Sequence, residues 1–172
     1  LEKELGVRKQ LTRQAIGNTA NMIKAHDERA KINKDRLDMM KAEGKSADAI
    51  FKQEVKNRKA KIQTANLVKR MAQDAIDIAE KQMKAEKKIL FSQGEVSKEK
   101  IAIFKKEMAP FWGQINKQKD ILNEFDNLQK DLKTENVLAH KRANTEKRKA
   151  SKEGYTSEKK IAADLLKAKN RN

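Results

Sequence analysis

Cysteine is absent from this sequence, which excludes disulfide bonds and thiol chemistry and leaves the redox compartment open. One proline and six glycines in 172 residues provide few positions at which a helix would have to stop. Aromatic residues are scarce, with one Trp, one Tyr and five Phe. No apolar run approaches the roughly 20 residues of a membrane-spanning helix, and no signal peptide is visible. These shortages argue against a large compact core and favour a polar, helical chain.

Helix-forming residues and positive charge dominate what is present. Ala, Lys, Glu, Gln, Leu and Met predict an all-α fold of long amphipathic helices with coiled-coil-like packing, assembling as a helical bundle or tube. The formal net charge of +16 indicates a polyanionic partner, either nucleic acid or an anionic membrane surface. A well-solvated helical surface is the alternative, because acidic and basic residues alternate in most stretches.

Three short motifs, each a glycine followed by serine or threonine, predict interruptions between helices. Glycine suits the position after a helix C-terminus, and a serine or threonine hydroxyl accepts a hydrogen bond from a free backbone N–H at the next N-terminus. Chance similarity among short turns is the alternative. The glycines are Gly44, Gly94 and Gly154, and the expected N-termini are Ser46, Ser97 and either Thr156 or Ser157.

These interruptions divide the chain into four expected segments. A helix at 1–44 precedes a long amphipathic helix at 45–93, and a helix at 94–153 kinked near Pro110 precedes a short helix at 154–172. An apolar stripe with an eleven-residue repeat runs from the second segment across Gly94, so a helix that continues there with a local distortion is the alternative to a turn.

This stripe is narrow and needs a partner helix, and identical copies are the simplest partners. We expect a parallel homo-oligomer around a channel lined by polar residues such as Gln82. A compact antiparallel fold, with the chain turning back at the junctions, is the competing prediction. The expected interface comprises Leu67, Val68, Met71, Ala75, Ile78, Ala79, Ile89, Leu90, Ile101 and Trp112.

No residue pattern indicates catalysis. The sequence has no glycine-rich phosphate loop, no serine-nucleophile motif and no dinucleotide-binding fingerprint. His26 and His140 lack neighbours at metal-ligand spacing, and both are expected to be solvated helix residues. The sequence therefore predicts a protein that is not an enzyme and that holds neither metal nor cofactor.

Two basic runs are candidates for non-specific phosphate binding. No aromatic residues are interleaved with them, so base stacking is not indicated. We expect sequence-independent binding to single-stranded DNA. The residues are Lys56, Arg58, Lys59 and Lys61 in the first run, and Lys141, Arg142, Lys147, Arg148 and Lys149 in the second.

Some of these features resemble a known family. The stretch beginning Lys61-Ile-Gln-Thr-Ala-Asn-Leu-Val, the motif Gly94-Glu-Val-Ser and the motif Met108-Ala-Pro-Phe-Trp resemble DNA pilot proteins, the minor virion protein H type of microvirus-like single-stranded DNA bacteriophages. The resemblance implies a virion protein whose helices form an oligomeric conduit that guides the genome through the host cell envelope during DNA ejection. It implies no individual functional residue.

That family also has a glycine-rich, apolar N-terminal region, which this sequence lacks. Because the sequence begins at Leu1, we expect a fragment of a longer protein, in which a preceding segment could attach to the host membrane. The alternatives are a basic helical scaffold, such as an assembly chaperone or a nucleoid-type binder, and an amphipathic protein of the membrane surface.

Overall fold

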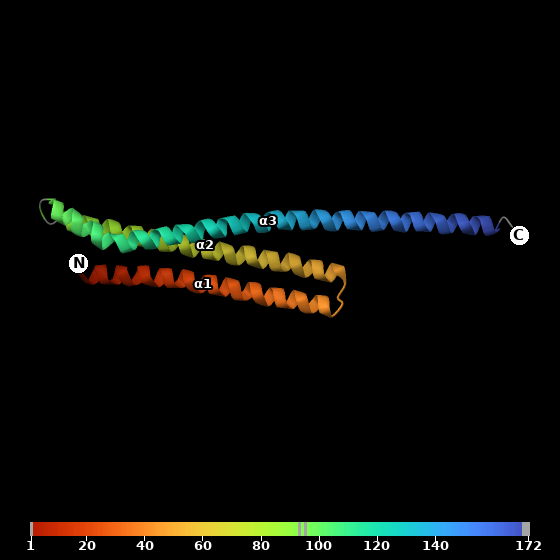
Figure 1. Cartoon of the computed structure of the whole chain (residues 1–172), viewed down its shortest axis with the longest axis horizontal. Coiled ribbons are helices and arrows are strands. Elements are labelled where there is room, and N and C mark those ends of the chain that lie inside the picture. The colour runs from red at the N-terminus through yellow and green to blue at the C-terminus, as the bar shows by residue number, and fades with distance from the viewer. Residues whose placement is uncertain (1, 93, 95, 170–172) are drawn as a thin grey trace. The chain divides into compact units, whose positions relative to one another are not determined.

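All regular secondary structure in the described part of the chain is α-helical. The computed structural model describes residues 2–92, 94 and 96–169, and within them lie three helices and no strand (Figure 1). The helices are α1 (Glu2–Ala42), α2 (Ala47–Ser92) and α3 (Lys98–Lys169). The predicted all-α fold is therefore confirmed.

The turn between α1 and α2 is built from the residues that the sequence indicated. Gly44 has a φ of 67°, in the left-handed region that favours glycine. The Gly44 N–H donates to the carbonyl of Lys41 at 3.1 Å, and the Lys45 N–H donates to that of Met40 at 3.0 Å. This is the hydrogen-bond pattern of a Schellman motif. The Ser46 hydroxyl then accepts a hydrogen bond from the Ala49 N–H at 3.3 Å and caps α2.

The interruption predicted at Gly94 is also present, and its alternative, a continuing helix, is wrong. Gly94 has a φ of 97°, and α2 and α3 end and begin on either side of it. The Ser97 hydroxyl accepts a hydrogen bond from the Lys100 N–H at 3.2 Å. Both predicted serine caps are therefore confirmed, because each needs only a hydroxyl three residues before a free N–H.

The interruption predicted at Gly154 is wrong, since α3 runs through it to Lys169. Thr156 does not cap a helix; its hydroxyl donates to the carbonyl of Lys152 at 2.6 Å, one turn earlier. Glycine inside a helix costs only about 1 kcal/mol relative to alanine, and the neighbouring residues keep the helix going. The helix also continues through Pro110, which therefore does not break it.

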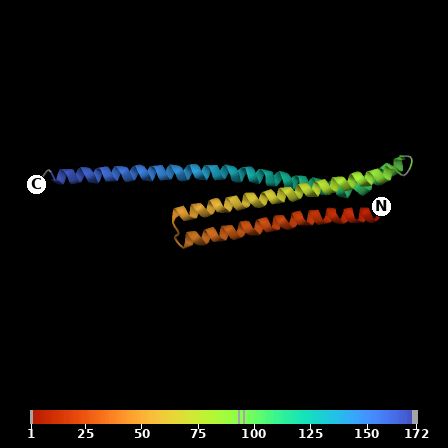
Figure 2. The same cartoon turned by 180° about the vertical axis from the view of Figure 1, so that it is seen from behind.

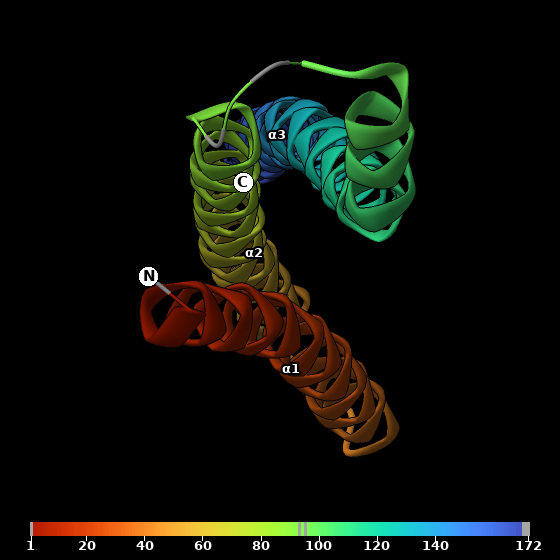
Figure 3. The ribbon, with the colours of Figure 1, turned by 90° about the vertical axis from the view of Figure 1, so that its left-hand side faces the viewer.

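Two compact units make up the chain, Leu1–Leu132 and Lys133–Asn172. In the first unit α2 lies between α1 and the initial part of α3, and it runs antiparallel to both (Figures 1 and 2). Figure 3, which views the helices nearly end-on, also shows α2 next to both α1 and α3. In the second unit, the described residues form a single helical segment, which is the remainder of α3.

The core of the first unit consists of two apolar clusters. One joins Ile76, Ala79 and Met83 of α2 to Met108 and Ile115 of α3. The other joins Ala65 and Val68 of α2 to Phe125 of α3, with half-buried side chains of α1 against it. A row of buried and half-buried residues of α3 follows alternating four- and three-residue spacings, namely Phe104, Met108, Phe111, Ile115, Gln118, Leu122, Phe125, Gln129 and Leu132.

Polar contacts accompany this packing between α2 and α3. The Lys69 amine lies 2.5 Å from the Asp126 carboxylate, and Lys130 reaches its other oxygen at 2.8 Å. Hydrogen bonds from Lys130 and then Lys69 lower the pKa of Asp126 from 3.8 to about 2. The Gln129 amide donates to the Asn66 side chain at 2.6 Å.

The face of α1 that is most deeply buried is polar. Thr12, Thr19 and His26 recur every seven residues and are at most 5% exposed. Thr12 donates to Gln82 of α2 at 2.6 Å, and the His26 Nδ1 forms a hydrogen bond of 2.6 Å with the Thr64 hydroxyl. Since His26 is buried, the prediction that it is a solvated residue is wrong.

The apolar stripe of α2 is largely covered by the chain itself. Val68, Ala75 and Ala79 are at most 2% exposed in the single chain. Their predicted assignment to contacts between copies therefore needs correction, because antiparallel turns at Gly44 and Gly94 bring helices of the same chain over them. Met71, Ile78, Ile89 and Leu90 are half-buried, while Leu67, Ile101 and Trp112 stay exposed.

Candidate nucleic-acid interface

The second unit carries an excess of positive charge. Residues 133–172 contain twelve Lys and Arg and five Asp and Glu, a formal charge of +7, against +9 for the much longer remainder. Four exposed basic residues of α3 follow one another at spacings of seven, four and seven. At 3.6 residues per turn they return to nearly the same side of the helix. We name them the basic column: Lys141, Arg148, Lys152 and Lys159.

The acidic residues of this unit lie outside the basic column. Side chains on a helix meet at three- and four-residue separations. At those separations from the four basic residues, the sequence places only uncharged or basic residues. The Lys159 amine instead lies 5.6 Å from the centre of the Tyr155 ring. Among the residues that the structure describes, no ion pair involves the column, and the acidic residues are Glu135, Glu146, Glu153, Glu158 and Asp164.

A second row of basic residues lies beside the column and differs from it. Arg142, Lys149 and Lys160 each precede an acidic residue by four positions, so their charges can be compensated along the helix. Lys147 faces a third direction, roughly 120° from the basic column. The predicted residues of this run are therefore divided among three sides of α3.

Lys152 ends the second basic run in the sequence and Lys159 lies beyond Gly154, and neither is among the predicted site residues. The signal that joins them to Lys141 and Arg148 is the seven- and four-residue spacing, which for Lys159 has meaning only once the helix is known to continue through Gly154. Over the basic column, the helix rises about 27 Å. This length offers four positive charges to several consecutive phosphates.

The first basic run, on α2, does not form one surface. Lys56 and Lys59 are exposed, whereas Arg58 and Lys61 are half-buried on another side of the helix. The Nε and one terminal nitrogen of Arg58 are buried without a hydrogen-bond partner in the described structure. Burial of the ring lowers the pKa of His26, and the charge of Lys61 lowers it further.

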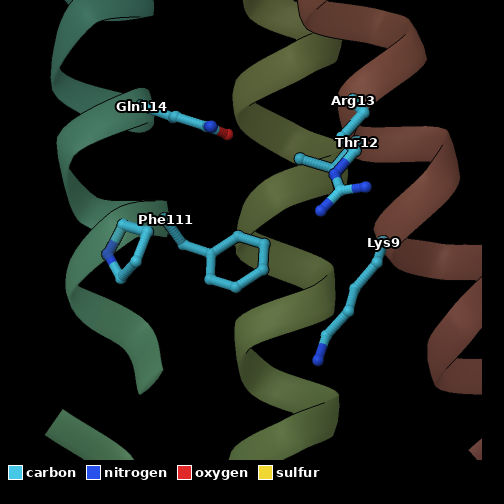
Figure 4. A pocket seen from close by; sticks show the side chains of 6 residues that line it. Lys9, Thr12, Arg13, Phe111 and Gln114 are labelled. Atoms are coloured by element: carbon cyan, nitrogen blue, oxygen red, sulfur yellow. The ribbon is translucent and has the colours of Figure 1, made fainter. Parts of the chain in front are cut away.

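A small pocket with polar and apolar side chains in its lining lies in the first unit, where α1 faces α3. Its volume is about 240 Å³, and Figure 4 shows Lys9 and Arg13 on one side and Phe111 on the other. Lys9 is 3.9 Å from Glu86, which also accepts a hydrogen bond from Gln82. Thr12 and Lys9, which line the pocket, are thus already engaged with Gln82 and Glu86 of α2.

Metal chemistry and membrane spanning find no support in the described residues. They contain no group of three or more His, Cys, Asp or Glu side chains that could hold a metal ion. No described helix combines the length and apolar character needed to cross a membrane. His140 is exposed.

Comparison with known proteins identifies no relative. No protein-family model, no curated protein and no solved structure matches the chain significantly. The charge distribution on α3 is therefore the main observation that bears on function.

Proposed function

We propose that this chain is a non-enzymatic helical scaffold that binds nucleic acid through the phosphate backbone, with the basic column of α3 as its contact surface. The observation that carries the proposal is the separation of charge on this helix. Four exposed cations share one side with no acidic residue within helical reach. Lys and Arg in such an arrangement neutralise phosphates and release condensed counterions, which gives affinity without base recognition.

The basic column supports this proposal more strongly than net charge does. A solvated surface with alternating charges would place an acidic residue within one turn of each lysine, as happens around four exposed lysines of α1. There Lys24, Lys31, Lys34 and Lys41 all have Asp or Glu three or four residues away. The two sets have similar spacing and equal charge, so they separate the effect of arrangement from that of total charge.

Binding of labelled single-stranded oligonucleotides, followed by fluorescence anisotropy over a series of salt concentrations, tests the proposal. The logarithm of affinity should fall linearly with the logarithm of salt concentration, by about 0.7 per phosphate contacted on a single strand. Replacing the four residues of the basic column by Gln should weaken binding and reduce this slope by up to about 3. Oligonucleotides of different base sequence should bind alike.

The matched control replaces the four α1 lysines by Gln and removes the same charge. We expect its slope to stay close to that of the unaltered protein, apart from the general effect of lower net charge. Equal losses in the two variants would show that only total charge matters. Unchanged binding by the basic-column variant would exclude this surface.

The conduit implied by the resemblance to DNA pilot proteins stays a prediction. It requires copies of the chain to assemble, and the α2 residues expected to join them are partly occupied by α1 and α3 of the same chain. Non-specific nucleic-acid binding needs only the exposed side of one helix, so it is the function that the geometry supports best.

A further inference from the structure

A groove in the first unit combines aromatic and basic side chains that are distant in the sequence. Phe104 and Trp112 of α3 line it together with Met83, Lys84 and Lys87 of α2, and Glu80 completes its wall. Its volume is about 340 Å³, within the range of roughly 300–1,000 Å³ of small-ligand pockets. The antiparallel return of the chain at Gly94 creates this combination.

Trp112 is unusual among the large aromatic residues of this unit because it is 53% exposed. Phe104 makes an edge-on contact with Phe91, which does not line the groove, at a centroid separation of 6.0 Å. Met83 belongs to the buried core and also lines the groove. An exposed indole in such a groove can stack on a planar ring that enters from solvent.

The charges beside Trp112 indicate the kind of molecule that carries such a ring. Lys84 and Lys87 are exposed and lie three residues apart, hence about 4.5 Å along the same side of α2. Glu80 is one turn before Lys84, so the positive end of the groove is at Lys87, which has no acidic residue three or four positions away. A ring joined to a negative group fits this polarity.

We propose that this groove binds single-stranded nucleic acid, with a base stacked on Trp112 and the adjoining phosphate paired with Lys84 and Lys87. Stacking on aromatic side chains beside a basic groove is the general mode by which single strands bind without sequence preference. The inference rests on the proposed function and makes it more specific, because the bases of a duplex are stacked on each other and unavailable to Trp112.

The chain contains a single Trp, so its fluorescence reports on the groove alone. We would titrate the full chain at low salt with an end-labelled ten-nucleotide oligothymidylate and follow label anisotropy and Trp fluorescence together. Anisotropy measures all binding, including that to the basic column. Quenching of Trp112 measures stacking in the groove.

An abasic oligonucleotide of the same length and charge is the matched ligand. We expect oligothymidylate to quench Trp112 and the abasic strand to bind without quenching. Binding of both strands with unchanged Trp fluorescence would overturn the groove proposal and leave the proposed function intact. If neither the oligothymidylate nor the abasic strand bound, the groove proposal and the proposed function would both be overturned. Anionic phospholipid vesicles serve as a further ligand, and a response of Trp112 to vesicles but not to oligothymidylate would also overturn the groove proposal.

Variants test the same contact without relying on fluorescence. Trp112→Ala should weaken oligothymidylate binding by about 5- to 150-fold, which corresponds to 1–3 kcal/mol of stacking on one base. It should leave binding of the abasic strand unchanged. Ile103→Ala is the control, since Ile103 is 50% exposed on the same helix and does not line the groove. Equal weakening by both variants, or a loss that extends to the abasic strand, would contradict stacking at Trp112.

Discussion

His26 connects all three helices of the first unit. Its ring forms a hydrogen bond with Thr64 of α2 and an edge-on contact with Phe125 of α3, at a centroid separation of 5.2 Å. Burial lowers the pKa of His26 below its ordinary value of 6.5; the charge of Lys61 acts in the same direction, and that of Asp27 acts against it. The neutral ring is therefore the form that the folded unit accommodates.

This position predicts a pH dependence of folding stability. Because the pKa of His26 is lower in the folded chain, the unfolded chain binds more protons as the pH falls below about 6.5. The stability contributed by the neutral ring is fully present above that pH and is lost as the pH falls toward the folded-state pKa. The urea midpoint, measured by circular dichroism at pH 7.5, 6.5 and 5.5, should therefore decrease.

The variant His26→Gln should be less stable at pH 7.5, because it loses the ring contact with Phe125, but its midpoint should change less between pH 7.5 and 5.5. His140→Gln, at an exposed position, should keep the pH dependence of the unaltered chain. If His26→Gln and the unaltered chain lost stability equally over this interval, His26 would not be its source.

Among the helical elements, the glycines show how one residue type has opposite effects in two settings. Gly44 ends α1 in a left-handed conformation, whereas Gly154 lies inside α3. At both positions an added Cβ would meet no atom within 4 Å. Backbone conformation alone should therefore determine the result of adding it.

We predict that Gly44→Ala destabilises the chain by about 1 kcal/mol or slightly more, because a non-glycine residue is disfavoured in that conformation. Gly154→Ala should increase the helicity of α3 and stabilise it by about 0.5–1 kcal/mol. Circular dichroism of both variants, with urea unfolding for Gly44→Ala, measures these effects. A loss of helicity in Gly154→Ala would restore the predicted interruption at that site.

For the whole molecule, the question is how copies could associate. A homo-oligomer that keeps the first unit folded has access only to the exposed part of the predicted stripe. The exposed part consists of Leu67 and Ile101, which are 42% and 37% exposed, and of Trp112, which also lines the groove proposed to bind nucleic acid. Val68, at 0%, is part of the core and is unavailable.

If the predicted homo-oligomer forms through these residues, light scattering should give a mass above that of one chain, and Leu67→Asp should lower that mass without loss of helicity. Gln73→Asp, at another exposed position of α2, is the control and should leave the mass unchanged. A single-chain mass for the unaltered protein would refute the predicted oligomer. If the Leu67→Asp variant kept a mass of two or more chains, the interface between copies would lie elsewhere.

The sequence alone determined the features that depend on neighbouring residues. The helical class follows from composition, and the caps at Ser46 and Ser97 follow from a hydroxyl three residues before a free N–H. The stop at Gly44 likewise needs only nearby carbonyls. Gly154 misled the prediction because glycine permits a helix end without requiring one, and no bond pattern comparable to that at Gly44 is present there.

Only the tertiary structure decided which faces are covered and which residues meet. The apolar stripe of α2 could be buried equally well by other copies or by the same chain, since helix amphipathicity does not specify a partner. The antiparallel turns selected the same chain, buried His26 among three helices and brought Trp112 beside Lys84 and Lys87. Such contacts join residues far apart in sequence, and no local spacing encodes them.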